Sequence, residues 1–173
     1  MRNLILCSLF TLSAFAQTNQ TAPSANDSWE RLHFLVGTWR AQTSAQGTAS
    51  AQGSGTYTFQ YDLNRNIITR TSSTDTCKGP ANFDCQHHDT LILYRDTGDS
   101  IPHALYADGE GHVIHYDITT PDANTAILLS NTPGPRFRLV YHLENNTMTG
   151  KFQFASPGSS DFKSYLEWSG ARQ

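Results

Sequence analysis

The sequence contains none of the short motifs that mark the commonest enzyme chemistries. It has no G-x-x-x-x-G-K-[ST] phosphate loop and no Rossmann glycine fingerprint, both of which bind nucleotides. It has no G-x-S-x-G elbow that would expose a nucleophilic serine. With only three cysteines and no C-x-x-C pair, it also lacks the usual redox spacing. We therefore favour a protein that is not an enzyme and expect no cofactor, although enzyme activity stays open.

Basic charge and long apolar runs are scarce as well. The 173 residues include 12 Lys and Arg against 15 Asp and Glu, and no stretch concentrates the basic ones. Nucleic-acid binding needs such a basic patch, so we expect no nucleic-acid partner. The longest mainly apolar stretch, residues 4–15, is shorter than the about 20 residues that a spanning helix needs. We therefore expect no insertion into a membrane.

The beginning of the chain, MRNLILCSLFTLSAFAQ, has the three parts of a secretory signal. Arg2 is the basic part, the apolar stretch follows, and Ala14-Phe15-Ala16 is a small-x-small cleavage site. We predict a signal peptide over 1–16, a disordered polar leader over 17–25 and one domain over 26–173, with an uncleaved anchor as the alternative. The mature protein would be secreted or periplasmic. Its formal net charge would be −4, one below the −3 of the whole chain, because Arg2 is the only charged residue removed.

Removal of Cys7 with the signal leaves Cys77 and Cys85. An even pair of cysteines in an exported chain indicates a disulfide, which here would close the short loop CKGPANFDC. The alternative is a metal site, for which His87 and His88 stand close by in the sequence.

The domain begins with a short helix and continues as strands. Asn26 or Asp27 can cap the helix, which Gly37 ends. Beyond Gly37 the apolar residues alternate, as in GTYTFQYDL, and turn residues separate the segments. Short connections predict antiparallel neighbours in an up-and-down β-barrel, with a two-sheet sandwich as the alternative. The predicted strands lie near 38–45, 53–62, 66–73, 88–95, 102–108, 112–119, 124–130, 136–143, 147–154 and 162–170.

The stretch FLVGTWR resembles the G-x-W signature of the calycin group, which includes lipocalins, fatty-acid-binding proteins and nitrobindin-like barrels. Gly37 and Trp39 occupy the signature positions, and the resemblance implies that Trp39 plugs one end of a barrel. The second half, with LYADGEGHVIHY, resembles small exported lipocalin-like bacterial domains of unknown function. Nitrobindin-like proteins bind haem through a histidine near the C-terminus, whereas the last predicted strand here, FKSYLEWSG, has none. The resemblance therefore does not extend to haem.

The stretch YADGEGHVIHYD raises the question of a metal site. In a strand over 112–119, His112 and His115 would point to opposite sides of the sheet, and DGEG would form the preceding turn. A different cluster, across strands, would use the candidate metal ligands His88, His103 and His112. This is the basis of an alternative function, a metal- or haem-dependent enzyme. A cell-envelope interaction module is a further alternative.

The aromatic residues on the predicted inner faces favour a different function. A barrel of this size can enclose one small ligand, and tyrosine hydroxyls would provide polar contacts in an apolar interior. Our leading hypothesis is that the barrel binds a small apolar or amphipathic molecule, and the oligomeric state is left open. The predicted ligand-binding residues are Trp39, Tyr57, Phe59, Tyr61, Tyr106, His112, Tyr116, Phe137, Arg138, Tyr141, Phe152 and Phe154.

Overall fold

The computed structural model describes residues 25–44, 47–81 and 83–173. A six-residue helix, α1 (Ala25–Glu30), continues as a 3-10 helix, η1 (Arg31–Leu35), and ten strands follow. The strands are β1 (Gly37–Thr43), β2 (Gln52–Asp62), β3 (Ile67–Lys78), β4 (Asp89–Arg95), β5 (Pro102–Asp108), β6 (Val113–Asp122), β7 (Thr125–Ser130), β8 (Arg136–Glu144), β9 (Thr147–Ala155) and β10 (Lys163–Arg172). The signal peptide predicted over 1–16 lies outside the described residues. So does the predicted leader, except its last residue, Ala25, which begins α1.

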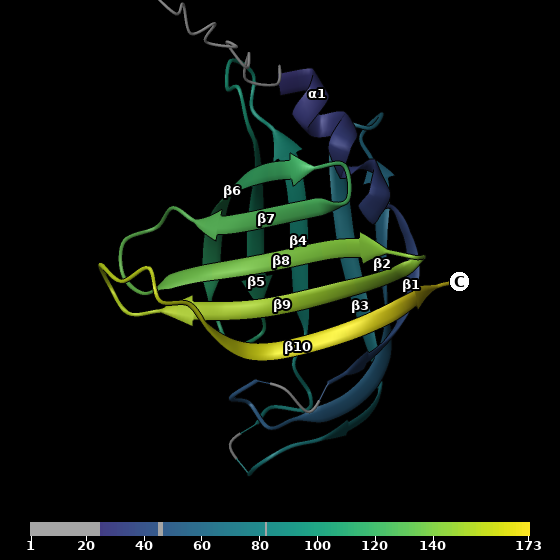
Figure 1. The fold of residues 1–173 in the computed structure, drawn as a ribbon, viewed down its shortest axis with the longest axis vertical. Coiled ribbons are helices and arrows are strands. Elements are labelled where there is room, and N and C mark those ends of the chain that lie inside the picture. The colour runs from purple at the N-terminus through teal and green to yellow at the C-terminus, as the bar shows by residue number, and fades with distance from the viewer. Residues whose placement is uncertain (1–24, 45–46, 82) are drawn as a thin grey trace, which may run out of the picture.

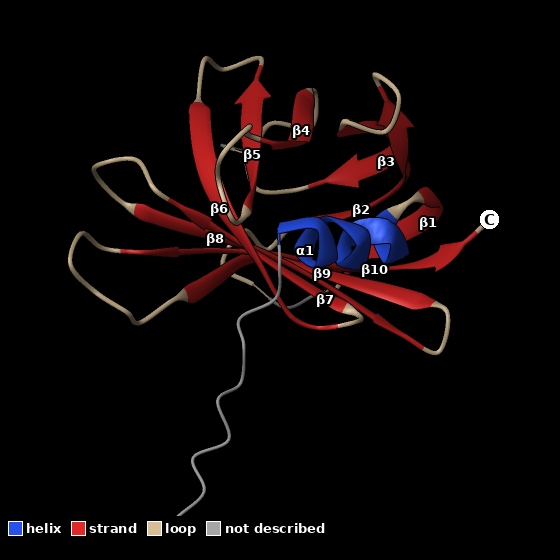
Figure 2. Ribbon diagram, turned by 90° about the horizontal axis from the view of Figure 1, so that it is seen from above, coloured by secondary structure: helices blue, strands red, loops and turns tan. Residues whose placement is uncertain are grey.

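The ten strands form one closed antiparallel barrel, which confirms the predicted fold class. Each strand pairs with its neighbours in sequence, and β1 pairs with β10 to close the sheet, with Trp39 opposite Arg172 and Thr43 opposite Trp168. Closure pairs both edges of the sheet around the barrel, but β3 pairs with β4 only over residues 67–70, so its second half, residues 71–78, pairs with β2 alone. Strands β8–β10 run across the view of Figure 1, while β4 and β5 run along its vertical axis. Seen from above, α1 lies over one end of the barrel (Figure 2).

The predicted strand boundaries agree with the structure to within three residues, except in β3. That strand continues to Lys78, where the prediction ends at 73, because its polar half pairs with the first half of β2. The register places Gly53 opposite Cys77. Cys77 is bonded to Cys85, so the predicted disulfide is present and ties the end of β3 to the loop before β4. We call residues 79–88 the disulfide loop.

One end of the barrel is closed around Trp39. The Trp39 indole is buried and donates a hydrogen bond to the Leu35 carbonyl at 2.9 Å. The Arg172 guanidinium lies 4.3 Å from the centre of a Trp39 ring and donates to the carbonyl oxygens of Val36 and Phe34, at 2.7 and 3.0 Å. Trp39 therefore lies where the resemblance places it, as the plug of one barrel end, which we call the closed end.

Gly37 allows this closure. Its φ of +139° is rarely open to other residues, and a Cβ there would stand 2.5 Å from Arg172 Nη1. The core next to it is apolar and includes side chains from the helices and the inner faces of most strands. Its largest fully buried members are Trp29, Trp39, Tyr116, Tyr141, Phe59, Leu32, Leu35, Ile68, Leu91, Leu93, Ile118 and Leu128. No helix among the described residues has the length and hydrophobicity needed to cross a bilayer.

Candidate functional site

A buried ion pair lies on the inner surface of the barrel. Ile68 and Arg70 share the inner face of β3, and Asp89 shares the inner face of β4 with Leu91. Arg70 Nη2 donates to Asp89 Oδ2, and the two side chains are only 10% and 14% exposed. Ser72 Oγ donates to the other Asp89 oxygen, Oδ1, at 3.0 Å. Both carboxylate oxygens therefore already accept a hydrogen bond.

Tyrosines surround this ion pair. Arg70 Nη1 donates to the Tyr141 hydroxyl at 3.0 Å, and the Tyr57 ring lies 6.5 Å from that of Tyr141. Burial raises the pKa of Tyr57, Tyr116 and Tyr141 above the usual phenol range, so all three stay protonated. Burial opposes the charge on Arg70, but the neighbouring Tyr141 and Asp89 outweigh it and hold the pKa of Arg70 above its usual value. The site thus combines one cation, one anion and neutral phenols.

Two polar atoms of this cluster have no hydrogen-bond partner among the described residues. They are Nε of Arg70 and Oη of Tyr57, on side chains whose residues are 8% and 7% exposed. Leaving a buried donor unpaired costs about 1–3 kcal/mol, and native structures contain few such groups. An ordered water or a bound molecule would relieve this cost. A molecule bound in the interior would therefore gain most by pairing with these two atoms.

A wall of aromatic rings lies beside the cluster. Phe137 and Phe152 stack with ring centres 5.8 Å apart, and the Trp168 ring lies 5.9 Å from that of Tyr141. These three side chains are only partly buried, although they pack against the core. Gly150 makes room for the indole, because a Cβ there would stand 2.1 Å from Trp168 Cε2. The inner surface therefore offers accessible aromatic area next to unpaired donors.

A polar network connects this interior to the end opposite the Trp39 plug, which we call the mouth. The Tyr106 hydroxyl donates to Asp108 Oδ2 at 3.2 Å and accepts from His87 Nε2 at 2.9 Å. Asp108 also accepts from the backbone N–H of Glu110 and from both the backbone N–H and the ring of His112. Burial would raise the pKa of Asp108, but the hydrogen bonds from His112 and Tyr106 outweigh it and lower that pKa. Burial is also the main cause that raises the pKa of Tyr106.

The mouth holds the side chains that would suit a metal ion. Two groups have ligand atoms within 4.8 Å of one another, and both include Glu110. One adds Asp84 and His87 from the disulfide loop, and the other adds Asp108 and His112. Imidazole and carboxylate together suit zinc or another first-row transition metal.

The three histidines that the sequence singled out do not form such a group. His112 lies at the mouth, and His88 is exposed beside it, where its carbonyl accepts from Gly109 N–H. His103 is at the other end of β5, roughly 17 Å along the strand from Asp108 at about 3.3 Å per residue. Its ring contacts Asp99 and Asp117 on the outer face, at 2.9 and 3.1 Å. His88, His103 and His112 therefore do not form the candidate cluster, because His103 lies at the opposite end of β5 from the mouth and on its outer face.

Most of the predicted ligand-binding residues face the interior. Tyr57, Phe59, Tyr116 and Tyr141 are buried there, Tyr61, Tyr106, Phe137 and Phe152 pack against that core, and Trp39 plugs the closed end.

Arg138 is an exception, because it alternates with the inward Leu139 and so lies outside the barrel. Its guanidinium donates to Gln153 and lies over Phe162. It is therefore not placed to contact a ligand in the interior. Phe154 is partly buried near the β9 end, opposite Phe137, and is not part of the core.

Arg70 and Asp89 were missed as site residues. Strand alternation carries a signal for both, because Arg70 follows Ile68 by two positions and Asp89 precedes Leu91 and Leu93 by two and four. A single charged residue in line with apolar inner-face residues is uncommon unless it is paired. One such residue on each of two adjacent strands, with opposite sign, is the pattern that would have identified the ion pair.

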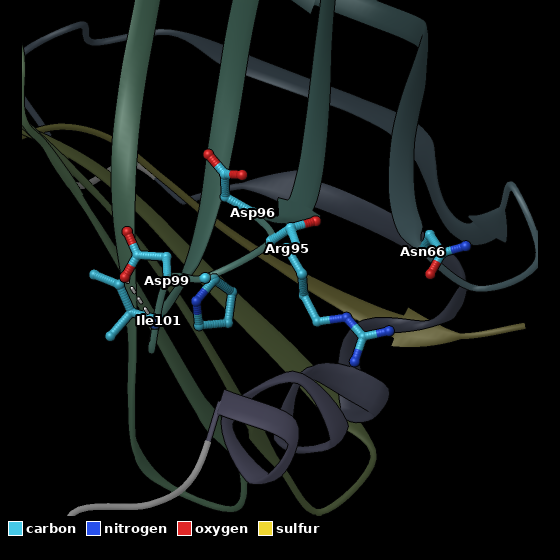
Figure 3. Close-up of a pocket in the computed structure, with 8 residues that line it drawn as sticks. Asn66, Arg95, Asp96, Asp99 and Ile101 are labelled. Carbon is cyan, nitrogen blue, oxygen red and sulfur yellow. Dashed lines mark hydrogen bonds between the residues drawn. The ribbon is translucent and has the colours of Figure 1, made fainter.

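Two hollows in the surface lie away from this cluster. One of about 300 Å³ lies beside the ends of β3, β4 and β5, with Asn66, Arg95 and Asp99 in its wall (Figure 3). The other, of about 470 Å³, lies along the polar ends of β1, β2 and β3, lined by Thr43 and Cys77 among others. Neither wall includes Arg70 or an interior tyrosine, so these hollows do not give access to the ion pair.

Comparisons with known proteins add no assignment to this geometry. No known family profile matches the sequence, and no curated protein is similar enough to count as a relative. The buried ion pair, tyrosines and unpaired polar atoms of the barrel interior are therefore the guide to function.

Proposed function

We propose that this protein is an exported barrel that binds a small amphipathic molecule inside, near Arg70. The observation that carries the proposal is the pair of buried, unpaired polar atoms, Arg70 Nε and Tyr57 Oη, beside accessible aromatic rings. Export is supported by the sequence of the predicted signal and by the Cys77–Cys85 disulfide, a bond typical of oxidising compartments.

The two parts of such a ligand match two parts of the interior. Its polar head would occupy the position between Arg70 and Tyr57 and accept their hydrogen bonds. Its apolar part would lie against Phe137, Phe152 and Trp168, which are partly buried and pack against the same core. Contact with apolar area contributes about 25 cal/mol per Å² removed from water, so the aromatic wall supplies affinity and the polar pair supplies orientation.

The outer surface gives less support to a role in holding a protein partner. The exposed large apolar side chains among the described residues are Leu63 in the β2–β3 turn, Val113 on β6 and Tyr165 on β10. Scattered single residues of this kind are ordinary on soluble proteins.

Native mass spectrometry of the protein purified after export, followed by solvent extraction, tests the proposal. We expect a retained small molecule whose release returns the mass to that of the chain. The matched variant Arg70→Met, with a side chain of similar length but no donor, should retain less. Wild-type protein that carries nothing and binds no added amphiphile would contradict the proposed function.

A further inference from the structure

The charge balance around Arg70 indicates which head group the interior accepts. We propose that the barrel selects an amphiphile with a neutral hydrogen-bond acceptor, such as the carbonyl of an amide or ester, over a carboxylate or an amine of equal chain length. This inference rests on the proposed function and names its ligand class.

The unpaired groups at the site are donors. Arg70 Nε–H can only donate. The Trp168 side chain reaches the Tyr57 oxygen, but the Tyr57 hydroxyl proton has no acceptor among the described residues. The Tyr141 oxygen accepts from Arg70, which leaves the Tyr141 proton free to be donated. The acceptors at the site, the two oxygens of Asp89, are already engaged by Arg70 and Ser72. A ligand that satisfies this site must therefore bring an acceptor.

The ion pair excludes a charged head group. Arg70 and Asp89 cancel formally, and the tyrosines are neutral, so the buried cluster has no net charge. A carboxylate would place a second anion beside Asp89, with no further cation to pair with it, and a buried unpaired charge is strongly unfavourable. An ammonium would face Arg70 and could only donate. A carbonyl oxygen accepts from Arg70 Nε and Tyr57 without adding charge.

One side of the mouth acts in the same direction. Asp84, Asp108 and Glu110 lie close together there, beside the starts of β4 and β6 and the end of β5. An anionic head group that passes this side meets three carboxylates, whereas a neutral amphiphile does not feel their charge.

Isothermal titration of the full mature chain with decanamide, decanoate and decylamine at pH 7.5 tests the inference. We expect decanamide to bind at least about tenfold more tightly than either charged probe. In Asp89→Asn the Arg70 charge is no longer cancelled, so decanoate should gain at least about tenfold relative to decanamide. The control Asp122→Asn changes an exposed carboxylate in the β6–β7 turn and should leave the ranking unchanged.

Tyr57→Phe provides a second test that does not depend on the folding of Asp89→Asn. It removes a hydroxyl whose proton has no acceptor among the described residues, so thermal stability should change little. Decanamide affinity should drop by about fivefold or more, because the ligand loses a buried donor. Unchanged decanamide affinity in Tyr57→Phe would overturn the inference.

The probes separate the two proposals. If decanoate binds wild-type protein as tightly as decanamide, the neutral-acceptor inference is wrong and the proposed function stands. If none of the three probes binds, and the exported protein retains no molecule, the proposed function is wrong and the inference falls with it.

Discussion

Breaking the Arg70–Asp89 pair should destabilise the barrel much more than removing both partners together. Asp89→Asn keeps the shape of the side chain but leaves the Arg70 guanidinium buried without a counter-charge. Arg70→Met leaves the Asp89 carboxylate with Ser72 as its hydrogen-bond donor. In Arg70→Met/Asp89→Asn no charge remains in the interior.

The burial of the two side chains sets the size of the effect. The two side chains are only 10% and 14% exposed, so water hardly reaches the pair. Breaking a pair buried in this way lowers the free energy of unfolding by about 3–5 kcal/mol. Asparagine keeps one acceptor, so we expect Asp89→Asn to lower the free energy of unfolding by about 3 kcal/mol. Arg70→Met should lower it by about 2–3 kcal/mol, because the Asp89 carboxylate that it leaves unpaired is closer to the mouth. The double variant should lose only about 1–2 kcal/mol, since replacing a whole buried pair is often close to neutral.

Urea denaturation followed by far-ultraviolet circular dichroism measures these free energies of unfolding. The three variants and the wild type form a double-mutant cycle, with an expected coupling of about 3–5 kcal/mol. Single variants that each cost less than about 1 kcal/mol and add in the double variant would refute the reasoning, because the pair would then behave as an exposed one.

The remaining predictions concern pH, packing and the disulfide. The pKa of Asp108 is lowered in the folded chain, so its carboxylate contributes fully to the free energy of unfolding above its unfolded pKa of about 3.9. This contribution is lost as the pH falls through the lower folded pKa. Asp108→Asn should therefore make the free energy of unfolding depend less on pH below about pH 4, and an unchanged pH dependence would contradict this. Gly150→Ala should cost about 1–3 kcal/mol in urea denaturation, because its Cβ would overlap the Trp168 indole, and a neutral result would show that the indole moves freely. Replacing Cys77 and Cys85 by serine should lower the free energy of unfolding by about 2–3 kcal/mol, and equal thermal stability with and without reductant would argue against it.

The fold was predictable from the sequence because alternation is a local signal. Residues such as Tyr57 and Phe59 are buried where the two-residue period places them, and the turn residues fix where each strand ends. The polar half of β3, TSSTDTCK, has no apolar alternation, so no local pattern indicates that the strand continues there. It forms because its backbone pairs with the first half of β2 across the hairpin.

The site was predictable only in part, because its chemistry depends on strand register. The aromatic inner face follows from alternation within single strands. The Arg70–Asp89 pair depends on which residues of β3 and β4 stand side by side, and a sequence read one strand at a time does not give this. His103 is far from the mouth for a different reason, because the antiparallel hairpin places it opposite Tyr94, at the other end of β4 from Asp89.

A high-resolution crystal structure of the exported protein soaked with decanamide tests the central claim most directly. The account predicts the amide oxygen within hydrogen-bond distance of Arg70 Nε and Tyr57 Oη, with the alkyl chain against Phe137, Phe152 and Trp168. An interior that holds only ordered water at those two atoms, with decanamide absent or bound on the outer surface, would contradict it.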